Sequence, residues 1–141
     1  MLDPITSEQL SADTHAKPLL LLVEDEDGVR RSLQLMLGSY GYDVISHSSA
    51  VGLAQDPNAM RAQCLICDLV MPRAGACELL VEMRNAGWRG KSILISGYPE
   101  EDWRDRAREV GFDAWLTKPI ASSILVRTIE RLLKEPGGEN P

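Results

Sequence analysis

Short apolar segments of strand length alternate with amphipathic segments of helix length along most of the chain. The apolar segments recur at intervals of roughly 20 to 25 residues, and they comprise residues 19–23, 43–45, 65–66, 92–95 and 112–116. An alternating order of strands and helices is typical of α/β folds, in which right-handed crossovers place helices on both faces of a parallel sheet. The pattern therefore predicts an open sheet of five parallel strands.

Four of the intervening segments carry apolar residues at helical spacing. The residues that mark these faces are Val29, Leu33, Met36 and Leu37; Leu79, Leu80 and Met83; Trp103, Ala107 and Val110; and Ile120, Ile124, Leu125, Ile129, Leu132 and Leu133. The third of these helices is crowded with charged residues, so we expect most of its surface to be solvated. Residues 49–60 give the weakest helical pattern because Gly52, Asp56 and Pro57 interrupt it.

Polar segments flank the regular pattern. Residues 1–17 predict a flexible tail, residues 18–135 one domain, and residues 136–141 a second flexible tail. A domain of this size buries roughly two-thirds of the surface of its unfolded chain, so it needs no metal or disulfide in order to fold. We expect no room for an attached DNA-binding output domain.

Charge and hydropathy disfavour two classes of partner. With 15 basic and 21 acidic residues and a net charge of −6, the chain lacks the clustered Lys and Arg that direct nucleic-acid binding requires. The longest apolar run, Leu19–Val23, is far shorter than the ~20 residues of a membrane span. The 3 cysteines cannot all pair within one chain, and free thiols are typical of a reducing compartment, so we predict a cytoplasmic protein.

Polar side chains follow four of the predicted strands at the point where each strand ends. These side chains are Glu24 and Asp25 after the first strand, Asp68 after the third, Ser96 after the fourth and Lys118 after the fifth. Ligands of an open parallel sheet bind outside the carboxyl ends of its strands. We therefore expect these residues to meet at one edge of the sheet.

Three carboxylates gathered at one edge would repel one another unless a cation lay among them. Mg²⁺ suits such a cluster, because it binds one or two carboxylates together with phosphate oxygens and water and needs no His or Cys. Lys118 adds a positive charge for an anion, and Ser96 adds a hydroxyl donor. Together these residues predict a phosphoryl site, although each one alone also fits an ordinary solvated loop, turn or helix start.

Four motifs at these strand ends resemble the receiver domain of two-component response regulators. They are LLLLVEDEDGVRRSL from Leu19, DLVMP from Asp68, ISG from Ile95 and LTKP from Leu116. The resemblance covers residues 18–133 and implies a flavodoxin-like sheet in the order 2-1-3-4-5 with helices on both faces.

The resemblance also implies the role of each residue in the predicted phosphoryl site. Asp68 would be the phosphoacceptor that attacks a phosphohistidine and forms an acyl phosphate. Glu24, Asp25 and Asp68, together with the backbone carbonyl of Val70, would hold Mg²⁺. Lys118 would pair with one phosphoryl oxygen.

Three further features follow from the same resemblance. Ser96 would hydrogen-bond a second phosphoryl oxygen and act as a switch residue together with Trp115, which stands where the family has a switch aromatic. Pro119 would follow Lys118 through a cis peptide bond. The glycine that the family uses at a positive backbone angle after the acceptor loop is shifted to Gly75 in this chain.

The partners implied are a sensor histidine kinase or histidine phosphotransfer protein as donor and a downstream protein as target. The domain would be a monomer or a weak phosphorylation-dependent dimer, and it would catalyse only its own phosphorylation and slow dephosphorylation. Alternatives are the C-terminal receiver of a hybrid histidine kinase, a phosphorylation-independent scaffold, and an aspartate-based phosphohydrolase. Val70 argues against the last, because such enzymes usually carry a second aspartate there.

Cys64 and Cys67 have the C-x-x-C spacing of redox and zinc sites. Because they lie within a predicted strand, their side chains should point to opposite faces of the sheet. We therefore interpret both cysteines, and Cys77 in the following helix, as buried structural thiols.

Overall fold

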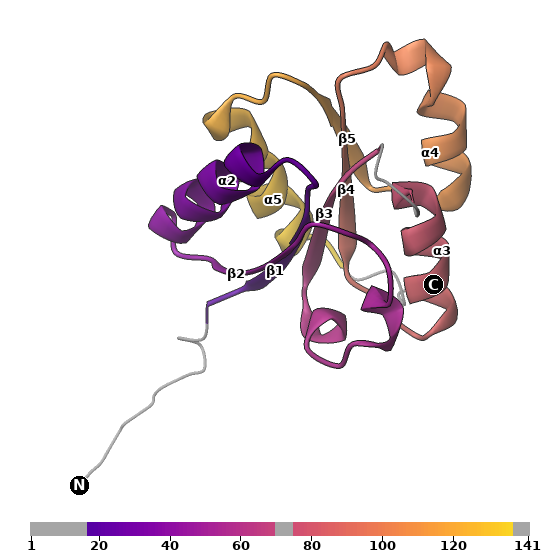
Figure 1. Ribbon diagram of the computed structural model, residues 1–141, viewed down its shortest axis with the longest axis horizontal. Helices are drawn as coiled ribbons and strands as arrows, with labels where there is room; N and C mark the ends of the chain where they lie inside the picture. Colours follow the sequence, from indigo (N-terminus) through magenta and orange to yellow (C-terminus); the bar gives the residue numbers. More distant parts are fainter. Residues whose placement is uncertain (1–16, 70–74, 137–141) are drawn as a thin grey trace, which may run out of the picture.

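The strands form one parallel sheet in the computed structural model, which describes residues 17–69 and 75–136 (Figure 1). Its order is β2-β1-β3-β4-β5, and all four strand pairs are parallel. The strands are β1 (Leu19–Val23), β2 (Asp43–His47), β3 (Cys64–Asp68), β4 (Lys91–Ser96) and β5 (Ala114–Thr117). The predicted strands and the flavodoxin-like order are thus confirmed. Phe112, expected at the start of the last strand, instead lies buried in the loop between α4 and β5.

Helices cover both faces of the sheet. They are α2 (Asp27–Ser39), α3 (Ala76–Asn85), α4 (Arg104–Val110) and α5 (Ser122–Lys134). Figure 1 shows α2 and α5 on one side of the sheet and α3 and α4 on the other. The helices predicted from apolar spacing are therefore present, and none of those in the described part of the chain is long and apolar enough to cross a membrane.

Two segments depart from regular α-helix. Residues 49–61 contain single 3₁₀ turns, η1 (Leu53–Gln55) and η2 (Ala59–Arg61), in place of the weak helix expected over 49–60. Gly52 starts the first turn in the left-handed region at φ 79°, and the proline at position 57 pushes its predecessor out of helical geometry. The third predicted helix is also divided, because η3 (Glu100–Asp102) is separated from α4 by Trp103, whose φ is −139°.

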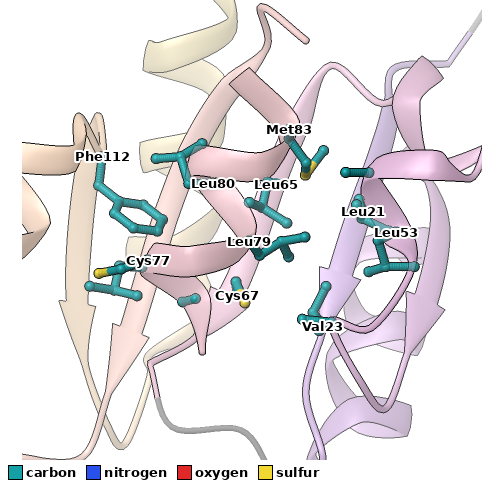
Figure 2. Packing of buried hydrophobic residues seen from close by; sticks show 14 of the residues in the cluster. Leu21, Val23, Leu53, Leu65, Cys67, Cys77, Leu79, Leu80, Met83 and Phe112 are labelled. Carbon is teal, nitrogen blue, oxygen red and sulfur yellow. The ribbon is translucent and has the colours of Figure 1, made fainter. Parts of the chain in front are cut away.

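Alternation along the strands divides the core into two clusters. Figure 2 shows the cluster between the sheet and α3, in which Leu79, Leu80 and Met83 pack against Leu65. Each of these fully buried side chains stabilises the fold by roughly 1.5–3 kcal/mol. The second cluster lies between the sheet, α2 and α5, and it contains apolar residues from all three.

The cysteines divide between these clusters as predicted. Cys67 and Cys77 belong to the cluster under α3, whereas Cys64 belongs to the opposite one. All three thiols are buried and free, and burial raises the pKa of Cys64 to about 12. Thiols in such surroundings are inert at neutral pH. The predicted tails, residues 1–17 and 136–141, lie outside the described residues except for Lys17 and Pro136.

Candidate functional site

Three acidic side chains meet at the carboxyl edge of the sheet. Val23 pairs with Cys67, so the next residues, Glu24 after β1 and Asp68 at the end of β3, lie on neighbouring strand ends. Asp25 follows on the β1–α2 loop. Each of Glu24, Asp25 and Asp68 offers a carboxylate oxygen, and these oxygens lie within 4.8 Å of one another. The structure therefore brings together the three acids expected from the sequence.

Lys118 lies between two of these carboxylates. Its Nζ is 2.7 Å from Asp68 Oδ2 and 3.4 Å from Glu24 Oε1. The lysine follows β5, and its backbone N–H donates to Ser96 O at 2.8 Å, which fixes the last strand end beside the fourth. The peptide bond from Lys118 to Pro119 is cis, as the resemblance implies. The lysine thus compensates part of the negative charge of the cluster.

The pKa values of Glu24 and Lys118 are both raised. Burial raises the pKa of the Glu24 carboxyl, and the charge of Asp68 adds to that rise, while the Glu26 backbone N–H and Lys118 oppose it. Burial alone lowers the pKa of Lys118, but hydrogen bonding to Asp68 and the charges of Asp68 and Glu24 outweigh it, so this pKa is raised. The site therefore favours bound protons or another cation.

The surroundings of Glu24 show where a cation fits. Glu24 is only 1% exposed, and its Oε2 accepts the Glu26 N–H at 3.1 Å. Among the described residues, its buried Oε1 has no hydrogen-bond partner; Lys118 approaches it only as an ion pair. A buried carboxylate oxygen without a hydrogen bond is costly. An all-carboxylate donor set with one unsatisfied oxygen is chemically suited to a hard divalent cation such as Mg²⁺.

Arg30 is a contributor to this loop that sequence reasoning missed. Its guanidinium donates to the backbone oxygen of Glu24 at 2.9 Å and to Asp27 Oδ1 at 2.6 Å. These bonds tie the first turn of α2 to the end of β1. The only available sequence signal is the spacing of three residues between Asp27 and Arg30 on one helix face.

Ser96 ends β4 beside β3, and it is fully buried. The Leu69 N–H donates to Ile95 O at 2.7 Å, so the pairing of β3 with β4 continues to the acidic edge. The Ser96 hydroxyl oxygen accepts the Tyr98 N–H at 3.0 Å. The structure thus places Ser96 at the same edge as Asp68 and Lys118.

Trp115 lies within β5, opposite Leu94, and it packs half-buried against the cluster under α3. Its Nε1 donates to Glu100 Oε2 at 3.2 Å. Its ring meets that of Trp103 edge to face, with centroids 6.3 Å apart and an interplanar angle of 89°. Glu100 as a partner of Trp115 could not be read from the sequence, since it depends on where the 3₁₀ turn η3 falls.

Two expectations concern the loop between Asp68 and α3. Val70, expected to supply a backbone carbonyl, lies outside the described residues. Gly75 does not adopt a positive backbone angle: its φ is −85°, in extended geometry at the N-terminus of α3. An added Cβ would lie 2.6 Å from Glu78 Oε1, the end of an exposed and flexible side chain that can move away, so space does not require glycine here.

Comparisons with known proteins agree with this arrangement. The family model of the response regulator receiver domain matches residues 20–130. The transcriptional regulatory protein FixJ of Rhizobium meliloti (strain 1021) is 31% identical over 110 residues, which cover 78% of this chain and 54% of FixJ. The sensor kinase CckA of Brucella abortus (strain 2308) is 32% identical over 130 residues, which cover 89% of this chain and 13% of CckA.

A solved structure gives the same picture of the fold. A CheY-like response regulator receiver domain protein from Methanospirillum hungatei JF-1 superposes with a TM-score of 0.75 at 21% identity, covering 84% of this chain and 95% of that one. The chain belongs to the response regulator receiver domain family. Receiver domains are signalling domains of two-component systems that interact with sensor kinases and downstream targets. The chain spans about half the length of FixJ, the regulator it matches above.

Proposed function

We propose that this domain accepts a phosphoryl group on Asp68 from a phosphohistidine and signals by a change of surface that a partner protein recognises. The observation that carries the proposal is the meeting of three carboxylates with Lys118 at one sheet edge. A phosphoacceptor site needs a nucleophile together with positive charge around the transferring group. The acidic cluster and the lysine supply both.

In this proposal an Asp68 oxygen attacks the phosphorus atom of the donor. An O–P bond forms while the P–N bond of the phosphohistidine breaks, and the electron pair of that bond stays on the histidine nitrogen, which takes up a proton. Lys118 Nζ lies 2.7 Å from Asp68 Oδ2. It is therefore placed to pair with a phosphoryl oxygen once Asp68 is phosphorylated. The Ser96 hydroxyl would donate to another.

Glu24, Asp25 and Asp68 would hold Mg²⁺, and by resemblance the Val70 carbonyl would be a further ligand. When bound, the ion offsets negative charge on the transferring group. The buried Glu24 Oε1, which among the described residues has no hydrogen-bond partner and only an ion pair with Lys118, is the observation that favours this role for the chain's own carboxylates. Arg30 and the Glu26 N–H keep the Glu24 backbone and side chain in place for it.

A cleft beside the site suits a protein donor. It has a volume of about 580 Å³ and runs from Lys118 and Pro119 to Val29 and Leu33 on α2. Its lining is mainly apolar, which favours a helix that presents apolar side chains around a reactive histidine. A sensor histidine kinase or a histidine phosphotransfer protein is therefore the proposed donor, and α2 is the element expected to select it.

The comparisons include two kinds of protein that contain a similar domain. FixJ is a transcriptional regulatory protein and CckA a sensor kinase, so similar domains occur in regulators and in kinases. We propose that this domain works through another protein or a phosphorelay, in the cytoplasm, without contacting DNA itself. Its net charge of −6 supports that choice.

The proposal is tested with phosphoramidate, a small donor whose P–N bond stands for that of phosphohistidine. In the presence of Mg²⁺ we expect one acyl phosphate per chain, which hydroxylamine removes. Asp68→Asn should abolish it. Asp43→Asn is a matched control, since Asp43 starts β2 at the opposite end of the sheet, and it should react like the unmodified chain. Equal labelling of Asp68→Asn would overturn the assignment.

A further inference from the structure

Trp103 is a buried residue that connects the two ends of the β4–α4 segment. It is 5% exposed and stands alone between η3 and α4. Its indole Nε1 donates to the Tyr98 backbone oxygen at 3.1 Å. Its ring packs in the cluster under α3 and meets the ring of Trp115 edge to face.

The Tyr98 backbone is held by hydrogen bonds rather than by packing of its own side chain. The Tyr98 ring is 56% exposed, so it anchors the turn only weakly. The Tyr98 N–H donates to Ser96 Oγ, while the Tyr98 carbonyl accepts from Trp103. Fixing this peptide therefore fixes the turn that begins at Ser96.

The hydrogen bond from the Tyr98 N–H also determines which further hydrogen bond the Ser96 hydroxyl can form. A hydroxyl group has one hydrogen to donate and lone pairs to accept. Because the Tyr98 N–H occupies an acceptor position on Ser96 Oγ, the hydroxyl hydrogen is the part directed to a further partner. An anion at the adjacent strand edge would receive it.

On the other side, Trp103 contacts a restrained Trp115. The Trp115 indole donates to Glu100, and Arg108 lies 5.9 Å above the Trp115 ring. Glu100 is also 3.4 Å from Arg104. Trp103 therefore packs against a side chain, Trp115, whose position is held by polar contacts.

We propose that Trp103 is a positioning residue of the phosphoryl site: its indole N–H holds the Tyr98 peptide so that the Ser96 hydroxyl faces the acceptor edge. The proposal rests on the proposed function, since it requires Asp68 to be phosphorylated. It adds a residue that neither the motifs nor the cluster of charges includes.

The test compares two tryptophan variants that lose the same kind of bond. Trp103→Phe removes the indole N–H and keeps a ring. Trp88→Phe is the matched control, because Trp88 is 4% exposed and donates to Ala62 O at 2.8 Å, before the start of β3 and away from the acidic edge. Loss of one such bond corresponds to about a threefold to tenfold change in a rate or equilibrium that depends on it.

The rate of Asp68 phosphorylation by acetyl phosphate with Mg²⁺ is measured by intact mass, at a temperature where circular dichroism shows each variant folded. We expect Trp103→Phe to slow it about threefold to tenfold and Trp88→Phe to leave it unchanged, while both lower the melting temperature. In a Ser96→Ala background, Trp103→Phe should have no further effect, because it acts through Ser96.

Three other results would contradict the proposal, and each points to a different step of it. An unchanged rate in Trp103→Phe, or an equal slowing by Trp88→Phe, leaves Trp103 as a core residue only. A full additional loss in the Ser96→Ala background removes the route through Ser96. If the unmodified chain is not phosphorylated at all, the proposed function itself fails, and Trp103 then has no phosphoryl site to position.

Discussion

Replacing Glu24 by Gln tests whether the acidic cluster is built around a cation. The side chain is buried, and its Oε1 lacks a hydrogen bond within the described residues. Replacing the buried carboxylate by a neutral amide relieves the desolvation cost of its charge, which is worth about 1–3 kcal/mol. Loss of the ion pair with Lys118, which is about one-quarter exposed, costs up to about 1 kcal/mol. Without divalent cations we therefore expect Glu24→Gln to be more stable by about 1 kcal/mol.

Magnesium should reverse that order. A cation present at 100 times its dissociation constant stabilises the folded state by about 2.7 kcal/mol. The unmodified chain should gain this amount, whereas Glu24→Gln, with one carboxylate fewer, should gain much less. Because 1 kcal/mol shifts the melting temperature by about 4 °C in a domain of this size, thermal unfolding with and without Mg²⁺ resolves both effects.

The same comparison has a predicted pH dependence. Folding raises the pKa of Glu24 above its ordinary value of 4.5. The carboxyl therefore stabilises the fold fully below that value, and this contribution is lost as the pH rises through the folded pKa. Without Mg²⁺, Glu24→Gln should match the unmodified chain in acid and exceed it at neutral pH.

Glu26→Gln is the control for this experiment, since it removes an exposed charge two residues away and keeps the backbone N–H that contacts Glu24. It should leave both the stability and the Mg²⁺ response nearly unchanged. Destabilisation of Glu24→Gln in the absence of Mg²⁺, or an undiminished response of that variant to Mg²⁺, would refute the reasoning.

Three further predictions concern other parts of the molecule. An added Cβ at Gly90 would lie 2.3 Å from Trp88 Cζ2, so Gly90→Ala should lower the free energy of unfolding by about 2 kcal/mol in urea; Gly38→Ala, with nothing within 4 Å, should raise it by about 0.5–1 kcal/mol. The pKa of Cys64 at about 12 predicts no reaction with a disulfide reagent at pH 7 until urea unfolds the chain; fast labelling of the native protein would contradict its burial. Lys118→Met should slow phosphorylation by acetyl phosphate roughly 100-fold, and a rate within twofold would remove the lysine from the site.

The strands and their order could be predicted because burial on both faces imposes continuous apolar segments at regular intervals. Once the sheet is parallel, the chemistry of its carboxyl edge follows from topology alone. Glu24 and Asp68 come together because β1 and β3 are neighbours in register. The division of Cys64 and Cys67 between the two faces follows from the same alternation.

Features that depend on local geometry could not be predicted. The segment at 49–60 retains apolar residues that pack into the core, but Gly52 and Pro57 allow only single 3₁₀ turns there. Trp115 donates to Glu100 at the start of η3, and apolar spacing does not reveal where that turn lies. At Gly75 the motif suggests a positive backbone angle, whereas the structure has extended geometry there, and the spacing of residues along the chain does not reveal that difference.

The most direct test of the central claim is the intact mass of the chain after incubation with acetyl phosphate, with and without Mg²⁺, beside Asp68→Asn. The account predicts a gain of one phosphoryl group that requires Mg²⁺ and is lost in Asp68→Asn. A folded chain that gains no phosphoryl group, or gains one equally well in Asp68→Asn, would contradict it.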